Sequence, residues 1–134
     1  MITTLRLRLW LALAGLSGAC AVAAEAFARH RLDSQTDAHT IELIGIASKY
    51  QTIHALALLF VLIFAEHLVG ARFARGATLT AGWAFAAGLV LFCGGLDALA
   101  AGAPPSLILM VPAGGGAFIF GWLALTLAAL IGNR

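Results

Sequence analysis

Charged residues are scarce in this sequence. Asp, Glu, Lys and Arg make up 10% of the 134 residues, whereas about a quarter of a soluble domain is charged. Hydrophobic residues make up 62%, and the mean hydropathy is +0.99. This composition excludes a soluble globular domain and predicts an integral membrane protein. Because a helix needs about 20 apolar residues to cross a bilayer, the length predicts a single domain, residues 1–134, with four spans and short loops.

Other absences narrow the functional classes. The net charge of +2 comes without a basic run or interleaved aromatic residues, so nothing predicts a nucleic-acid partner. The two cysteines, Cys20 and Cys93, lie in apolar segments, where we expect packing residues and not a disulfide or a metal pair. The sequence contains no phosphate-binding loop, dinucleotide fingerprint or hydrolase motif. It therefore predicts neither an enzyme nor a bound cofactor.

Long apolar segments dominate the rest of the sequence. They predict an all-α integral membrane protein with spans over about residues 5–28, 50–69, 79–101 and 107–131. The first segment begins like a secretory signal peptide, but its apolar stretch is long enough to cross a bilayer, so we expect it to be retained. Helical periodicity in the second segment begins near residue 38, well before the span. Residues 38–49 are therefore predicted to form an amphipathic extension at the membrane interface, where Gly45 could allow a bend.

Small residues are expected where helices pack closely. Gly15 and Gly18 lie among alanines in the first helix, and small residues at such spacing are typical of helix contacts in lipid. In the fourth helix, packing and a local kink are predicted at Pro112, Gly114, Gly115 and Gly116. The kink is expected because proline removes a backbone hydrogen-bond donor.

The distribution of basic residues predicts an orientation. Four spans place both termini on one side of the membrane. That side carries Arg6, Arg8, Arg72, Arg75 and Arg134, and the other side carries Arg29, Arg31 and Lys49. Because Lys and Arg are enriched in cytoplasmic loops, we expect both termini in the cytoplasm and the chain in a bacterial inner membrane.

Polar residues gather on the opposite, non-cytoplasmic side. The stretch "YQTIHALALL" (50–59) opens the second span at the level where the first and third helices end. The predicted cluster comprises Glu25, Arg29, His30, Tyr50, Gln51, His54 and Asp97. One interpretation is an interhelical hydrogen-bond network, worth about 0.6 to 2 kcal/mol per bond. The other is a shallow ligand or proton site, since ionisable residues within a span often mark such pathways.

Metal binding by this cluster is not favoured. Histidines on facing helices can ligate haem iron, but of the two candidates, His30 and His54, the first is expected in the loop. A zinc site would need Glu25 and Asp97 as well, and zinc requires a tighter ligand set than this spacing predicts. We therefore expect no metal.

Several segments resemble one family. The stretch "YQTIHALALL" resembles the signature of small four-helix membrane proteins known as domain of unknown function 423, with animal transmembrane protein 256 as a relative. "EAFARHRL" (25–32), "AGWAFAAGLVLFCGG" (81–95) and "VPAGGGAFIFGWLAL" (111–125) resemble further segments of that family in the same order. Glu25 stands where the family has glycine, and Asp97 where an aromatic residue is expected, so the chain resembles a divergent member. The resemblance implies the four-helix architecture, and the family has no established activity to carry over.

Two functions fit these observations. The first is a structural or accessory subunit that packs in the lipid bilayer against a larger membrane complex, such as a respiratory or transport complex, or against further copies of itself. Small size, minimal loops and small-residue helix faces favour it. The alternative is a protein that binds or transports a small molecule (a proton, a quinone or a lipid) through the polar cluster.

Overall fold

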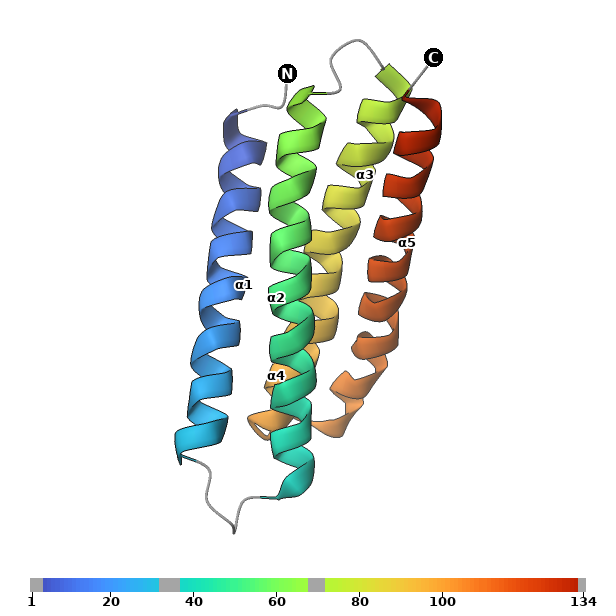
Figure 1. Cartoon of the computed structure of the whole chain (residues 1–134). Helices are drawn as coiled ribbons and strands as arrows, with labels where there is room; N and C mark the ends of the chain where they lie inside the picture. Colours follow the sequence, from blue (N-terminus) through green and yellow to red (C-terminus); the bar gives the residue numbers. More distant parts are fainter. Residues whose placement is uncertain (1–3, 32–36, 68–71, 133–134) are drawn as a thin grey trace.

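The computed structural model describes residues 4–31, 37–67 and 72–132, which form an antiparallel helical bundle (Figure 1). Its helices are α1 (Thr4–Arg31), α2 (Ala38–His67), α3 (Arg72–Gly88), α4 (Gly94–Ala100) and α5 (Met110–Ile131). A π-helical turn, η1 (Leu89–Cys93), joins α3 to α4, and a 3-10 turn, η2 (Pro105–Leu109), precedes α5. The start of α1 and the end of α5 lie at the same end of the bundle (Figure 1).

Four helical segments are long and apolar enough to cross a membrane: Leu5–His30, Ala38–Ala65, Arg72–Ala100 and Pro105–Ile131. Helices satisfy their own backbone hydrogen bonds, which hydrocarbon cannot do for them. No strand occurs in the described parts of the chain. The predicted all-α architecture with four spanning helices is therefore confirmed.

The second helix differs from the expectation for its first part. α2 is continuous from Ala38 to His67, without a break at Gly45. Residues 38–49 continue the helix in line, and the α1–α2 hairpin extends beyond the turn between α4 and η2 (Figure 1). Within this part, Ala47 and Ser48 are buried. The segment therefore stands along the bundle axis, because its packing holds it there, and does not lie flat at the interface.

The third helix begins before the predicted residue 79. α3 starts at Arg72, and the segment that reads as a loop forms its first two turns. Ala74 and Thr78 are buried on the inner face of these turns, and the Thr78 hydroxyl donates to the backbone oxygen of Ala74 at 2.9 Å. Burial of this face extends the helix into a sequence that has two arginines and weak hydropathy.

Local irregularities occur where glycine and proline allow them. At the end of η1 the backbone N–H of Gly94 donates to the carbonyl of Leu89, five residues earlier, which is the π-helical pattern. Gly102 has a φ of +88° in the tight turn before η2, a conformation that glycine adopts without a steric penalty. Pro112 lies in the first turn of α5, directly after the 3-10 turn η2, and the kink expected there stays a prediction.

Close packing of α3 on α5 depends on glycines that face aromatic residues. A Cβ added to Gly88 would overlap the ring of Phe118, and one added to Gly121 would overlap the ring of Phe85. Gly114 lies flush against the backbone of Phe92 in η1. Of the residues expected to pack in α5, Gly114 therefore makes the closest approach. Gly115 makes an ordinary contact with the Phe92 ring, whereas Gly116 and Pro112 are exposed.

The first helix lies at the edge of the bundle. α1 turns a narrow small-residue face, with Ala14, Ser17 and Ala21 buried, toward the rest of the molecule. A Cβ added to Gly15 or Gly18 would meet no atom within 4 Å; Gly15 is exposed, and Gly18 is half-buried. Trp10 extends the packing of α1 to α3: its ring lies against Gly82 and meets the ring of Trp83 edge-on at 5.5 Å.

Candidate functional site

His54 is the buried centre of the predicted polar cluster. It lies roughly midway along α2 and is 3% exposed. Its Nδ1 is 2.9 Å from the backbone oxygen of Tyr50, and its Nε2 is 3.2 Å from Nε1 of Trp122 in α5. A carbonyl only accepts and an indole N–H only donates. The two bonds therefore fix the neutral imidazole with its proton on Nδ1, which leaves neither ring nitrogen free for a ligand.

Aromatic rings enclose this imidazole. The ring of Phe118 in α5 stacks on His54 with centroids 3.5 Å apart. The ring of Phe85 in α3 has its centroid 5.5 Å from that of His54. Gly88 and Gly121 leave the space that these two phenylalanines occupy. The sequence feature behind the enclosed histidine is thus the placing of glycines opposite aromatic residues on α3 and α5.

Gln51 and Asp97 form a second, separate contact. The Gln51 side-chain amide donates from Nε2 to Oδ2 of Asp97 at 2.8 Å, which joins α2 to α4. Asp97 also lines a cavity of about 290 Å³ with Ala24 and Phe27 of α1. The Oε1 atom of Gln51 is buried without a hydrogen-bond partner among the described residues. This pair connects helices, and the cavity beside it is otherwise apolar.

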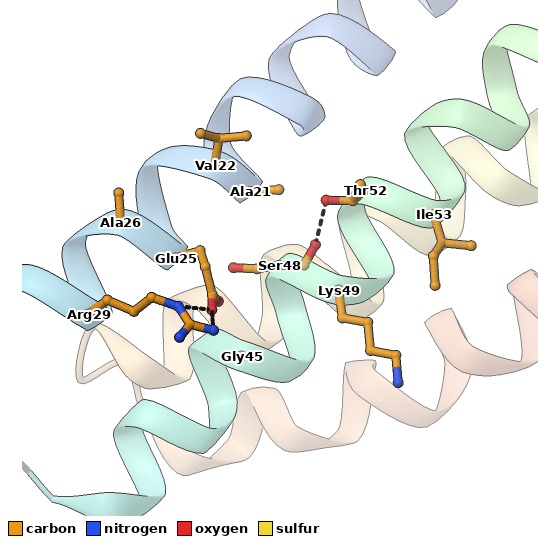
Figure 2. A pocket seen from close by; sticks show the side chains of 10 residues that line it. All are labelled: Ala21, Val22, Glu25, Ala26, Arg29, Gly45, Ser48, Lys49, Thr52 and Ile53. Carbon is orange, nitrogen blue, oxygen red and sulfur yellow. Dashed lines mark hydrogen bonds and ion pairs between the residues drawn. The ribbon is translucent and has the colours of Figure 1, made fainter.

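The third group faces outward between α1 and α2. Glu25 and Arg29 form an ion pair one turn apart on α1, with Oε1 of Glu25 2.6 Å from an Arg29 guanidinium nitrogen. They line a groove of about 660 Å³ whose other side is formed by residues of α2 (Figure 2). The lining residues are Ala21, Val22, Glu25, Ala26, Arg29, Gly45, Ser48, Lys49, Thr52 and Ile53. Charged residues and apolar residues therefore line the same groove.

The structure therefore divides the predicted cluster. His54 is enclosed, Gln51 pairs with Asp97, and Glu25 with Arg29 opens onto the α1–α2 groove. The remaining members are His30, exposed near the end of α1, and Tyr50, whose ring lies 4.9 Å from that of Phe92. The predicted residues therefore form three separate groups and not a single shallow site. His54 lies about midway along α2, inside the bundle, and it is buried.

Sequence reasoning missed two important participants. Trp122 lies outside the predicted polar cluster, yet it supplies the donor to His54. Its position four residues after Phe118 on α5 is the signal that links both to one helix face. Ser48 was not singled out, although it is 5% exposed and lines the groove. The small-residue face of α2 around Gly45 is the only sequence feature that marks it.

The described residues offer no assembled metal centre. No group of three or more His, Cys, Asp or Glu side chains is placed to hold an ion within these ranges. Cys20 is exposed and Cys93 is buried, and both are free thiols. The arrangement can hold helices together through hydrogen bonds and can receive a ligand laterally, in the α1–α2 groove.

Comparison with known proteins places the chain in a family. A family model described as a protein of unknown function (DUF423) matches residues 24–115. The UPF0382 membrane protein YwdK of Bacillus subtilis is 32% identical over 92% of this chain and 98% of its own length. A UPF0382 membrane protein of Haemophilus influenzae is 36% identical over 87% of this chain and 89% of its own length. No solved structure matches the chain. The four-helix architecture, the matched family model and these full-length similarities show that this chain belongs to the DUF423 family of membrane proteins.

Proposed function

We propose that this protein is a non-catalytic accessory subunit that packs in the bilayer against a larger membrane assembly. We place it in the bacterial inner membrane with both termini in the cytoplasm. The observation that carries the proposal is the outer side of α1. This helix buries only a narrow face in its own bundle and presents large apolar residues beside the exposed Gly15.

Such a face suits contact with another transmembrane helix. Hydrocarbon tails solvate leucine as well as a protein does, so helices associate in lipid through close packing at small residues. Leu11 and Leu16 flank the open space at Gly15, and Leu16 is 65% exposed. A neighbouring helix could approach there without displacing any side chain of this chain.

The internal polar groups support the same function. The bonds from His54 to Tyr50 and Trp122 use both imidazole nitrogens, and the core toward the other end of α2 contains apolar residues such as Leu58 and Val61. A proton conductor needs a continuous chain of exchangeable groups. Here the buried histidine instead ties α2 to α5, as expected of a rigid subunit whose activity lies in its lateral contacts.

Site-specific photo-crosslinking in native membranes tests this proposal. A photoreactive amino acid at Leu16 should crosslink to a defined membrane protein in constant yield, whereas one at Leu58, which is 0% exposed, should not. A third probe at Leu123, exposed on α5, tests whether the contact is specific to α1. Crosslinks to lipid alone from both exposed positions would reject an accessory role. Crosslinks only to a second copy of this chain would replace it with a homo-oligomer.

A further inference from the structure

The groove between α1 and α2 is open to the side of the bundle. Its walls are apolar over much of their area, with Ala21, Val22 and Ala26 on α1 and Ile53 on α2. Charged residues stand at its rims, as Figure 2 shows: the Glu25–Arg29 pair on α1 and Lys49 on α2, whose side chain projects away from that pair. The described residues therefore form a surface that combines apolar walls with excess positive charge.

The charges of the groove do not cancel. Arg29 and Lys49 carry one positive charge each, and Glu25 carries one negative charge, which is already paired with Arg29 at 2.6 Å. Lys49 forms no ion pair with the other described residues. It lies within the candidate span Ala38–Ala65. A charge in a span is costly unless it is paired or reaches the headgroups. We therefore expect the Lys49 ammonium to pair with an anion at the membrane surface.

Polarity changes along the groove in the direction that a phospholipid requires. α2 has 30 residues, which corresponds to about 45 Å of helix against about 30 Å of hydrocarbon. The ends of the α1–α2 hairpin therefore reach the headgroup level. Arg29 is close to that end of α1, whereas Val22 lies two turns deeper, and Ile53 lies one turn deeper than Lys49. Charge lies toward the headgroups and apolar surface toward the acyl chains.

A buried hydroxyl provides an independent indication. Ser48 is 5% exposed, and its Oγ has no hydrogen-bond partner in the described ranges. In Figure 2 this hydroxyl points toward α1 at the floor of the groove. Its neighbour Thr52 is satisfied, since the Thr52 hydroxyl donates to the Ser48 backbone oxygen at 2.9 Å. An ester carbonyl that enters between α1 and α2 would accept a bond from Ser48.

We propose that the α1–α2 groove binds one anionic phospholipid. Its phosphate pairs with Lys49 and is attracted by Arg29, and one acyl chain lies over Val22 and Ile53. The ester region faces Ser48. This site does not depend on the accessory role, because it is formed by residues on the opposite half of α1 from the uncovered Gly15.

Native mass spectrometry of the purified, intact chain tests the charge requirement. Defined phosphatidylglycerol or phosphatidylcholine is added, and the lipid-bound fractions are compared. We expect a preference for phosphatidylglycerol that falls about fivefold in Lys49→Gln, in line with the attraction of one basic residue for anionic lipid. Arg72→Gln, which removes the same charge at the other end of the bundle, should retain it. An unchanged preference in Lys49→Gln would overturn the proposal.

A second pair of variants tests the groove itself. Gly45 lines the groove and has no atom within 4 Å of an added Cβ, so Gly45→Leu fills the space without a backbone clash. Gly116 is equally open but lies on α5, which makes Gly116→Leu the matched control. We expect Gly45→Leu to lose bound phospholipid while Gly116→Leu keeps it. Equal lipid binding by both variants would refute the site, as would a loss of oligomeric mass and not of lipid in Gly45→Leu, because the occupant would then be a protein helix.

Discussion

The packing of α5 on η1 predicts opposite effects for the same substitution at two glycines of one helix. Gly114→Ala places a methyl group against the backbone nitrogen and Cα of Phe92, atoms that cannot rotate away. Gly116→Ala places the same group in open space. The two positions lie in the same turn of α5, so the change in helix propensity is the same at both.

The magnitude follows from two terms. Replacing glycine with alanine inside a helix gains about 0.5 to 1 kcal/mol, whereas overpacking a tight contact costs about 1 to 3 kcal/mol. Gly116→Ala should therefore leave the free energy of unfolding unchanged or raise it slightly. Gly114→Ala should carry the packing cost as well. The difference between the two variants should be about 1 to 3 kcal/mol, because the shared propensity term cancels.

Reversible unfolding in mixed micelles measures this difference. The free energy of unfolding is obtained for the parent chain and each variant by titrating a denaturing detergent into a mild one, with helix content by circular dichroism as the signal. Gly114→Ala should unfold at a lower fraction of denaturing detergent than Gly116→Ala. Equal midpoints would refute the close approach of α5 to η1, and a less stable Gly116→Ala would contradict the open environment at that residue.

Three further predictions use the same preparation. A double-mutant cycle of His54→Phe and Trp122→Phe should give a coupling free energy of about 0.6 to 2 kcal/mol for the bond between the two rings, and no coupling would show that the bond does not form. Gln51→Leu and Asp97→Leu should each destabilise the bundle while the double variant costs less than their sum, because each single variant leaves the other group unpaired; additive costs would reject the contact. In a Cys20→Ser variant the remaining thiol is Cys93, which is 0% exposed and should react with a membrane-permeant thiol reagent only as the chain unfolds. In a Cys93→Ser variant the exposed Cys20 should react in the folded state. Similar reaction rates for the two thiols would contradict the burial of Cys93.

Composition and hydropathy were sufficient for the architecture. A chain with 62% hydrophobic residues and four long apolar segments has few alternatives to a helical bundle. The helix ends were harder to predict. Residues 72–78 read as a loop because of their arginines and glycine, and they form helix because Ala74 and Thr78 pack inside. Hydropathy windows report transfer into lipid and do not report this burial against protein.

The candidate site, like the fold, could be predicted only in part from the sequence. The residue types and the shared side of the membrane brought Glu25, Gln51, His54 and Asp97 to attention, and Gln51 does meet Asp97. The pairing of His54 with Trp122 could not be read from the sequence. It depends on the rotation of α5 about its own axis, which is set by Gly114 and Gly121 against η1 and α3. Such facing contacts between distant glycines and aromatic residues leave no local periodic signal.

The groove was missed for a related reason. Lys49 and Ser48 were assigned to an interfacial segment, and only the continuous α2 places them opposite Val22 and Arg29 of α1. The excess positive charge is visible once these two helices are aligned side by side. A prediction of helix pairing would therefore have been needed before the groove could be recognised.

Purification of the intact protein from its native membranes in mild detergent tests the accessory role most directly. The preparation is resolved by native mass, and the proteins in each species are identified by peptide mass spectrometry. If the chain is an accessory subunit, it should be recovered with other membrane subunits in fixed stoichiometry. Recovery as a monomer or as a homo-oligomer alone, under conditions in which other membrane complexes stay intact, would contradict that function.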